Sequence, residues 1–423
     1  MASLAGALAV GAVGLDQVAT EDWLKRLSWI YSGGAEGASL LLGTVAGSMI
    51  AIAGTVFSMT LVALSLASSQ LGPRLLRNFM RDTANQVVLG TFVATFVYCL
   101  LVLRTIRRGD EVAFVPHLAV SIGVLLAIVS IGVLIYFIHH VSVSVQADKV
   151  VAQVGRELVD GIDRLFPGHL GKPASEVSSA TGEAAVPAAF AREARPVGAL
   201  EDGYLQQIAT EALMDLAAEE DLLLRLECRP GDYLVKGRAM VMVWPGDRVT
   251  NTLVEKINAA FVLGDQRTAT QDAEFSFKQL VEIAVRALSP GINDPFTAIA
   301  CVDRLGSGLC RLAERDIPSG RRFDSHGRLR LVAPGSTFAG IVDTSLNQIR
   351  QSARSNPAVT IRMLDAIAQI ATHSRHAQDT ACLHRHASMI VRGAREAVPE
   401  AEDLLAVESA FATATQALRE LHG

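Results

Sequence analysis

Charged residues are scarce in this chain of 423 residues: Asp, Glu, Lys and Arg make up 19% of it, whereas hydrophobic residues make up 50%. An ordinary soluble domain is about 25% charged. Three long segments contain no Asp, Glu, Lys or Arg, namely Gly37–Leu71, Val87–Leu103 and Val112–Val145. A bilayer core of about 30 Å needs about 20 apolar residues of helix. The sequence therefore predicts three membrane-spanning helices.

The chain also lacks the basic stretch with which a signal peptide begins. Its opening, MASLAGALAVGAVGL, is apolar but shorter than the roughly 18 residues of a membrane span. We expect this opening to be part of a longer helix or a re-entrant segment. The predicted helical membrane domain, residues 1–140, thus has three to four spans.

Paired cysteines, an excess of positive charge and catalytic motifs are missing as well. The five cysteines show no CxxC spacing, and the formal net charge is −5. Reduced thiols are therefore favoured over a disulfide framework or a zinc site, and no nucleic-acid partner is indicated. The chain contains no GxGxxG, Walker A, HExxH or GxSxG string. We predict neither catalytic residues nor a cofactor.

Basic residues orient the spans. Arg74, Arg77 and Arg81 follow the first long segment against one acidic residue, Asp82, and the positive-inside rule places them in the cytoplasm. Successive spans cross the membrane in opposite directions, so residues 104–116 are predicted to lie outside, despite three arginines there. Everything after residue 140 is then predicted to lie in the cytoplasm.

Small and hydroxylated residues recur along the first long segment. They are Gly43, Gly47, Ala51, Thr55, Ser58, Ser65 and Ser69. Their spacing places them on one helical face, where the lack of bulk lets another helix approach closely. Two interpretations are open: packing between helices of one subunit, or a pathway lined by several subunits. No predicted span contains Asp, Glu, Lys or Arg, which argues against a proton-coupled transporter.

A connecting helix at residues 141–166 is expected to continue the third span without a break, because no proline occurs before Pro167. Residues 167–200 are rich in Ala, Gly, Ser and Pro and predict a flexible linker. In residues 201–270, apolar runs separated by two Pro-Gly-Asp turns predict a small β-barrel or sandwich, with a helix at Leu205–Ala218 before it.

Residues 271–423 predict a helical bundle, because apolar residues recur at helical spacing from Phe275 onward. A hairpin turning at Asp324–Gly327 interrupts the helices. The expected helices lie near Pro295–Ala313, Phe338–Ala353, Pro357–Ser374, Asp379–Ala397 and Glu400–Leu421. The predicted fold is thus a membrane helical domain followed by a cytosolic α+β region.

The segment RALSPGINDPFTA, Arg286–Ala298, combines a turn with many polar groups nearby. Asp294 is predicted to cap the helix that begins at Pro295. Two interpretations are open for the polar groups around it: a structural network of ion pairs and caps, or a site for an anionic ligand. The residues concerned are Arg267, Asp272, Arg286, Asn293 and Asp294.

One segment is rich in side chains that ligate metals. THSRHAQDTACLHRH contains His373, His376, Asp379, Cys382, His384 and His386. Their spacing matches no standard zinc pattern, and Arg375 and Arg385 would repel a cation. We therefore predict a solvated helical turn here and no metal.

Two strings carry a family resemblance. FSMTLVALSLASSQLGPRLLRNFMRD and QRTATQDAEFSFKQLVEIAVRALSPGINDPFTAI resemble the bacterial predicted membrane protein family called domain of unknown function 2254. The resemblance covers nearly the whole chain. It implies an integral protein of the bacterial inner membrane with a large cytosolic portion, and it supplies no catalytic residues.

These observations predict a homo-oligomeric channel or channel-like pore in the lipid bilayer. The face from Gly43 to Ser69 would surround the symmetry axis, and the cytosolic domain would assemble and gate the pore. The alternative is a membrane-anchored sensor or regulator that binds a small ligand or ion near Arg286–Asp294.

Overall fold

The computed structural model describes residues 1–18, 31–71, 83–107, 114–144, 146–166 and 186–420. It divides into two compact units, Met1–Lys149 and Val150–Gly423.

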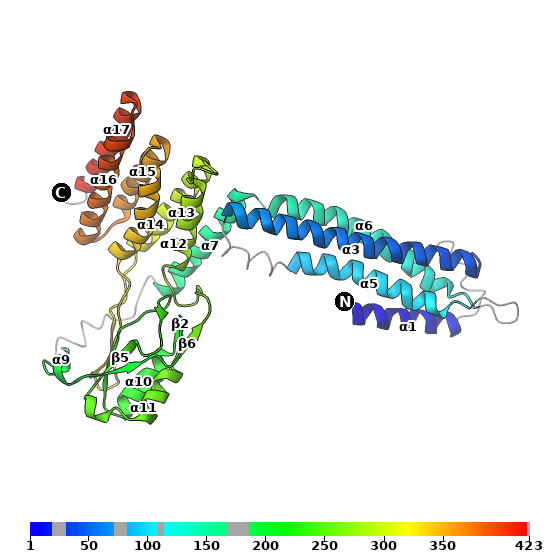
Figure 1. The fold of residues 1–423 in the computed structure, drawn as a ribbon, viewed down its shortest axis with the longest axis horizontal. Helices are drawn as coiled ribbons and strands as arrows, with labels where there is room; N and C mark the ends of the chain where they lie inside the picture. The colour runs from blue at the N-terminus through cyan, green and yellow to red at the C-terminus, as the bar shows by residue number, and fades with distance from the viewer. Residues whose placement is uncertain (19–30, 72–82, 108–113, 145, 167–185, 421–423) are drawn as a thin grey trace. The chain divides into compact units, whose positions relative to one another are not determined.

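Four helices form the described part of the first unit (Figure 1): α1 (Ala2–Val18), α3 (Ala35–Leu71), α5 (Thr83–Thr105) and α6 (His117–Ser144). Helices α3, α5 and α6 are long and apolar enough to cross a membrane, and α1 is a shorter apolar helix. The three predicted segments are thus confirmed as helices of sufficient length and apolarity. The arginines at residues 74–81, which oriented them, lie outside the described residues.

Helix α5 packs against the other three helices of this unit. Its side chains Phe92, Tyr98 and Val102 are fully buried. The Tyr98 hydroxyl donates a 2.9 Å hydrogen bond to the carbonyl oxygen of Ala119 in α6. A hydroxyl group among apolar helices must find such a partner, because leaving it unpaired costs free energy. The bond therefore helps to hold α5 against α6.

The opening helix α1 is joined to the same bundle. It buries Ala5, Ala9 and Ala12. Near its end, the Asp16 carboxylate accepts hydrogen bonds from the backbone N–H groups of Leu118 at 3.0 Å and Ala119 at 2.9 Å. These belong to the first turn of α6, where N–H groups lack partners within the helix and the helix dipole favours a negative charge. Asp16 thus caps a neighbouring helix.

Helix α7 (Ala147–Leu165) is separate from α6, which ends at Ser144. This corrects the prediction of one unbroken helix through residues 141–166. The last residues of α6 read VSVS, and β-branched residues and Ser both have low helix propensity. The apolar face predicted for α7 is confirmed by its buried residues Val151, Val154, Leu158 and Ile162.

Eight strands lie in the described part of the second unit. They are β1 (Arg195–Gly198), β2 (Gly203–Ile208), β3 (Leu223–Leu226), β4 (Tyr233–Leu234), β5 (Ala239–Trp244), β6 (Phe261–Gly264), β7 (Arg321–Phe323) and β8 (Leu329–Val332). They form a five-stranded sheet of order β1-β5-β3-β8-β7 and a three-stranded sheet of order β4-β2-β6. Only β3 and β8 pair in parallel.

The predicted barrel is not formed, because neither described sheet closes on itself. The edge strands β4 and β7 have two and three residues, which is too short to extend a sheet further. Helices α10 (Thr210–Glu219) and α11 (Asn251–Ala259) share one apolar core with both sheets (Figure 1). This core contains Leu205, Leu213, Leu224, Met240, Leu253, Phe261 and Leu331.

The sheets draw on residues before and after the predicted β region at 201–270. Strand β1 lies within the predicted linker at residues 167–200, of which residues 167–185 are outside the described residues. The predicted helix at Leu205–Ala218 is a strand followed by the shorter α10, because GYLQQI alternates in burial as a strand does. The predicted hairpin is confirmed: β7 and β8 are antiparallel, and Gly327 has φ +77°, which glycine adopts readily.

Helices dominate the rest of the second unit (Figure 1). They are α9 (Phe190–Glu193), the 3₁₀ turn η3 (Gly246–Arg248), α12 (Phe275–Ala287), α13 (Pro295–Ala313), α14 (Phe338–Ala353), α15 (Pro357–His373), α16 (Ala377–Ala397) and α17 (Ala401–Glu420). The predicted helices from Pro295 onward are confirmed. Asp294, Thr337 and Asn356 cap three of them with side-chain oxygens that accept backbone hydrogen bonds.

Arg330, on β8, is buried at 7% exposure and is held by two carboxylates. It donates to Asp324 and to Asp221, each at 2.8 Å. The hydrogen bond from Arg330 lowers the pKa of Asp221 below its ordinary value. For Asp324, burial acts in the raising direction, but bonds from Arg330 and the turn backbone lower the pKa overall.

Acid below about pH 4 should therefore weaken the second unit. A carboxyl group with a lowered folded-state pKa contributes stability that is complete above its unfolded pKa of about 3.9 and is lost as the pH falls toward the folded value. We expect the urea midpoint to fall as the pH drops below the unfolded pKa of about 3.9, and to fall less in Asp324→Asn, which has no proton to gain there. Equal slopes of midpoint against pH in both proteins would contradict this assignment.

Candidate functional site

Helix α3 presents its small residues away from the other helices of its unit. Gly43, Gly47, Ala51, Thr55 and Ser58 are all exposed in the single chain. Ser65 is exposed as well, whereas the side chain of Ser69 lies outside the described side chains. The six described residues of the predicted stripe thus lie on one outer face of α3.

Different residues of α3 contact its own subunit. These are Leu42, Ala46, Met49, Ala53 and Val56, which are buried against α5 and α6. The intrasubunit packing that the sequence left open therefore uses another face. The small face remains available to lipid or to another copy of the chain.

The outer face contains more small residues than the sequence pattern singled out. Thr44, Ser48 and Gly54 are exposed beside the predicted positions. Between residues 43 and 58, the only large exposed side chains are Ile50 and Phe57. A side chain at Gly43, Gly47 or Gly54 would meet no atom of the described chain within 4 Å. Nothing described in the single subunit thus requires glycine at these three positions.

The hydroxyls on this face are partly satisfied by the helix itself. Thr44 donates to the Leu40 carbonyl at 2.7 Å, Ser48 to the Thr44 carbonyl at 2.8 Å, and Thr55 to the Ala51 carbonyl at 3.1 Å. Such bonds allow a hydroxyl to lie inside a membrane without a partner on another helix. Each hydroxyl oxygen keeps its capacity to accept a further hydrogen bond.

The polar residues predicted around Arg286–Ala298 are not gathered in one place. Arg267, which is half-buried, and the buried Asp272 form an ion pair just before α12. Arg286, Asn293 and Asp294 lie at or beyond the other end of α12. A helix of its length, Phe275–Ala287, separates the two groups by about 20 Å. The structure therefore divides the predicted network into two.

The first group belongs to a charge network around a small cavity of about 150 Å³. Arg229 contacts Glu274 at 2.9 Å, and Lys278 contacts the same carboxylate at 2.8 Å. The pKa of Asp272 is raised by burial, against the effect of Arg267. Burial also acts to raise the pKa of Glu274, but Lys278 and Arg229 lower it overall. Each carboxylate thus has a basic partner, as a structural network requires.

Glycine at position 231 makes room for the Arg267–Asp272 pair. Gly231 has φ +94° in the turn before β4. A Cβ atom there would overlap both the Asp272 carboxylate and the Arg267 guanidinium. Both the backbone conformation and the close approach therefore favour glycine.

At the other end of α12, Asp294 caps α13 as predicted. Its carboxylate accepts from the Thr297 N–H at 3.1 Å and from the Thr297 hydroxyl at 2.5 Å. Asn293 has φ +50°, a conformation that Asn tolerates better than most residues. The Asp294 carboxylate therefore contacts the first turn of α13, the place of the anionic ligand in one of the two open interpretations.

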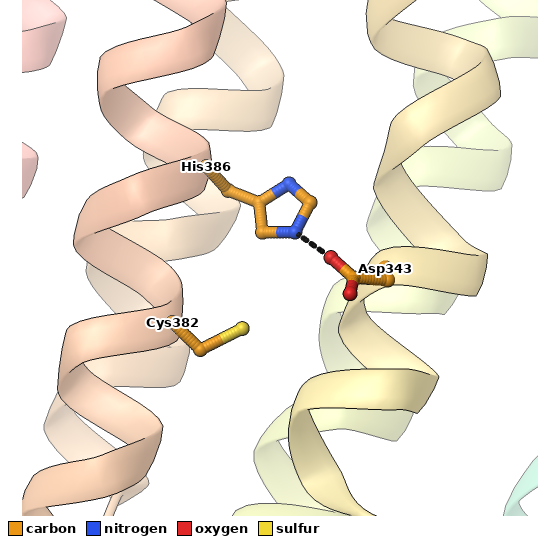
Figure 2. A group of neighbouring side chains, drawn as sticks. All are labelled: Asp343, Cys382 and His386. Carbon is orange, nitrogen blue, oxygen red and sulfur yellow. Dashed lines mark hydrogen bonds and ion pairs between the residues drawn. The ribbon is translucent and has the colours of Figure 1, made fainter.

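A third group was not predicted. Asp343 on α14 meets Cys382 and His386 on α16, and their ligand atoms all lie within 4.8 Å of one another. Figure 2 shows Cys382 and His386 one helical turn apart, both directed toward Asp343. A hydrogen bond of 2.7 Å joins His386 Nε2 to the Asp343 carboxylate. Cys382 and His386 are buried, which corrects the prediction of a solvated turn for these two residues.

Burial and charge set the protonation of this group. Burial raises the pKa of Cys382, despite a hydrogen bond from Arg385. Burial lowers the pKa of His386, despite the neighbouring Asp343 carboxylate. Both directions favour the uncharged forms at neutral pH, a thiol at Cys382 and a neutral imidazole at His386. Sequence spacing identified Cys382 and His386, but Asp343 lies on another helix and gave no signal.

A larger cavity of about 550 Å³ lies between α7, α13 and α15. Its charged residues are matched: Asp303 pairs with Arg362, Arg311 pairs with Asp163 at 2.6 Å, and Glu314 contacts His373 at 2.6 Å. None of the predicted ligand-binding residues lines it.

Comparison with known proteins identifies the family. The family described as predicted membrane protein (DUF2254) matches residues 1–369. The chain belongs to this family. Two relatives, an uncharacterized protein of Mycobacterium bovis and one of Mycobacterium tuberculosis, are each 33% identical over 385 residues, which cover 89% of this chain and 72% of theirs. No solved structure matches the chain.

Membership in DUF2254 agrees with the three apolar helices of the first unit. The match covers the whole described first unit, both sheets and most of the helices of the second unit, and it ends within α15. Asp343 lies inside the matched region, whereas Cys382 and His386 lie beyond it.

Proposed function

We propose that this protein is a homo-oligomeric channel or channel-like pore of the bacterial inner membrane. In this proposal, the small face of α3 surrounds the symmetry axis, and the second unit lies in the cytosol, where it assembles and gates the pore. One observation carries the proposal: the exposed face of α3 from Gly43 to Ser58 consists almost wholly of Gly, Ala, Ser and Thr.

The length of this face supports the proposal. Residues 43–58 extend over about 24 Å of helix, which is most of a hydrocarbon core of about 30 Å. A helix surrounded by lipid alone has no need of small residues over such a length, because lipid chains adapt to large side chains. Helices that approach one another closely do need them.

The chemistry of the same face suits a passive pathway. Its hydroxyl and backbone groups can exchange hydrogen bonds with water or with a partly hydrated ion. Each of the three spans has a long segment without Asp, Glu, Lys or Arg. These segments are Gly37–Leu71, Val87–Leu103 and Leu118–Ile138. Coupled transporters usually need an ionisable group inside the membrane. We therefore favour a channel over a pump.

The sensor alternative has weaker support. Its proposed residues are divided between the two ends of α12. Arg267 and Asp272 pair with each other, and Asp294 contacts the first turn of α13. A ligand would have to displace these contacts before it could bind.

Leucine at position 58 should block the pore. Ser58→Leu places a branched apolar side chain on the proposed lining, and a hydrophobic constriction resists the entry of water and ions. We expect flux from potassium chloride-loaded liposomes to fall by roughly tenfold or more, equivalent to about 1.4 kcal/mol of added barrier. The measurement is potassium and chloride release after reconstitution at equal protein content.

Ser142→Leu provides the matched control. Ser142 is exposed near the end of α6, a different helix, and its hydroxyl also bonds to its own helix. We expect its flux to equal that of the wild type. The channel proposal is contradicted if the wild-type protein releases neither ion, or if Ser58→Leu releases both as fast as the wild type does.

A further inference from the structure

The group formed by Asp343, Cys382 and His386 is independent of the proposed pore. Asp343 comes from α14, while Cys382 and His386 lie four residues apart on one face of α16 (Figure 2). Two side chains at this spacing point the same way from consecutive turns of a helix. The helix pair thus presents a thiol, an imidazole nitrogen and a carboxylate to a single point.

We propose that Asp343, Cys382 and His386 bind a zinc ion through Sγ, Nε2 and one carboxylate oxygen. Zinc accepts sulfur, nitrogen and oxygen ligands in a tetrahedron, whereas magnesium and calcium require oxygen ligands alone. Three protein ligands leave the fourth position for water. Binding releases the Cys382 thiol proton to solvent, since zinc binds the thiolate. It also requires the His386 proton to move from Nε2, which faces the Asp343 carboxylate, to Nδ1, because zinc binds the lone pair of Nε2.

The distances are close to those that zinc requires. Ligand bonds of about 2.0–2.3 Å place tetrahedral ligands roughly 3.3–3.7 Å apart. The His386 Nε2 and Asp343 Oδ1 atoms are 2.7 Å apart, and the other ligand atoms are within 4.8 Å. Side-chain movements of about 1 Å would therefore complete the site. Asp343, whose side chain is 38% exposed, provides the solvent-facing side through which the ion enters.

The Arg385 guanidinium contacts two of the atoms that would bind zinc. Its guanidinium donates to Asp343 at 2.7 Å and to Cys382 Sγ at 3.6 Å. The side chain is 53% exposed, so it can turn into solvent when a metal ion arrives. Zinc and Arg385 therefore compete for the same two ligand atoms. The site is exchangeable, in contrast to a closed structural zinc site.

Cobalt binding tests the proposal in the full-length protein. Purified protein is kept reduced, freed of metal with a chelator, and titrated with Co²⁺, which adopts the same tetrahedral sites as zinc and absorbs light there. We expect one equivalent of Co²⁺ to produce a thiolate-to-cobalt absorption band, and Zn²⁺ to remove that band by displacement. Cys382→Ser should abolish the band and weaken Zn²⁺ binding by about a hundredfold or more.

Two further variants distinguish the loss of a zinc ligand from a folding defect. Cys310→Ser changes a cysteine outside the group, partly buried on α13, and should retain the full band. Arg385→Ala should tighten Zn²⁺ binding by about two- to fivefold, because it removes an exposed competing ion pair. The absence of a cobalt–thiolate band in the wild type, its retention in Cys382→Ser, or weaker Zn²⁺ binding by Arg385→Ala would each overturn the proposal.

Discussion

Gly47→Leu is expected to dissociate the oligomer. Gly47 lies at the centre of the small face of α3, and a side chain there would contact no described atom of its own subunit. The single chain should therefore fold normally. In the assembly, the leucine would lie between closely packed helices, where overpacking costs about 1–3 kcal/mol at each contact. Association should weaken by roughly ten- to a hundredfold per contact.

Native mass spectrometry of the purified protein in detergent measures this effect directly. We expect the wild type to give a single oligomeric species and Gly47→Leu to give mainly monomers, with flux lost in parallel. Gly132→Leu is the matched control, because Gly132 is also an exposed membrane glycine, on α6, with no described atom within 4 Å of an added Cβ. A monomeric wild type, or equal dissociation by both variants, would refute a symmetry axis lined by α3.

Leu331→Ala should strongly destabilise the second unit. Leu331 is fully buried at 0% exposure on β8, in the core that both sheets share with α10 and α11. Removing a buried leucine side chain costs about 2–5 kcal/mol, because apolar contacts are lost and a cavity remains. The size of the loss depends on β8 being inserted between β3 and β7.

Urea unfolding monitored by Trp244 fluorescence measures this loss. Trp244 lies at the end of β5 in the same sheet, and Trp23→Phe with Trp29→Phe removes the only other tryptophans of the chain. Leu405→Ala, at a leucine that is 57% exposed on α17, should change the free energy of unfolding by less than about 0.5 kcal/mol. If both variants unfold at the wild-type midpoint, β8 is not in the core.

The sequence alone determined the features that depend on near neighbours. Charge-free stretches of 17 residues or more identify the candidate spans, because the bilayer excludes unpaired charge. The expected starts of α13 and α14, Pro295 and Phe338, match the structure, since a capping Asp294 or Thr337 specifies where each helix begins. The small stripe on α3 was also visible, because helical spacing decides which residues share a face.

Tertiary structure alone decided how those elements combine. The small face of α3 points away from its own subunit because Leu42, Ala46 and Met49 pack better against α5 and α6. Strand β8 joins β3 from more than a hundred residues away, and Asp343 reaches Cys382 and His386 from another helix. Such pairings depend on many contacts between distant segments. The combined free energy of these contacts cannot be inferred from a local sequence pattern.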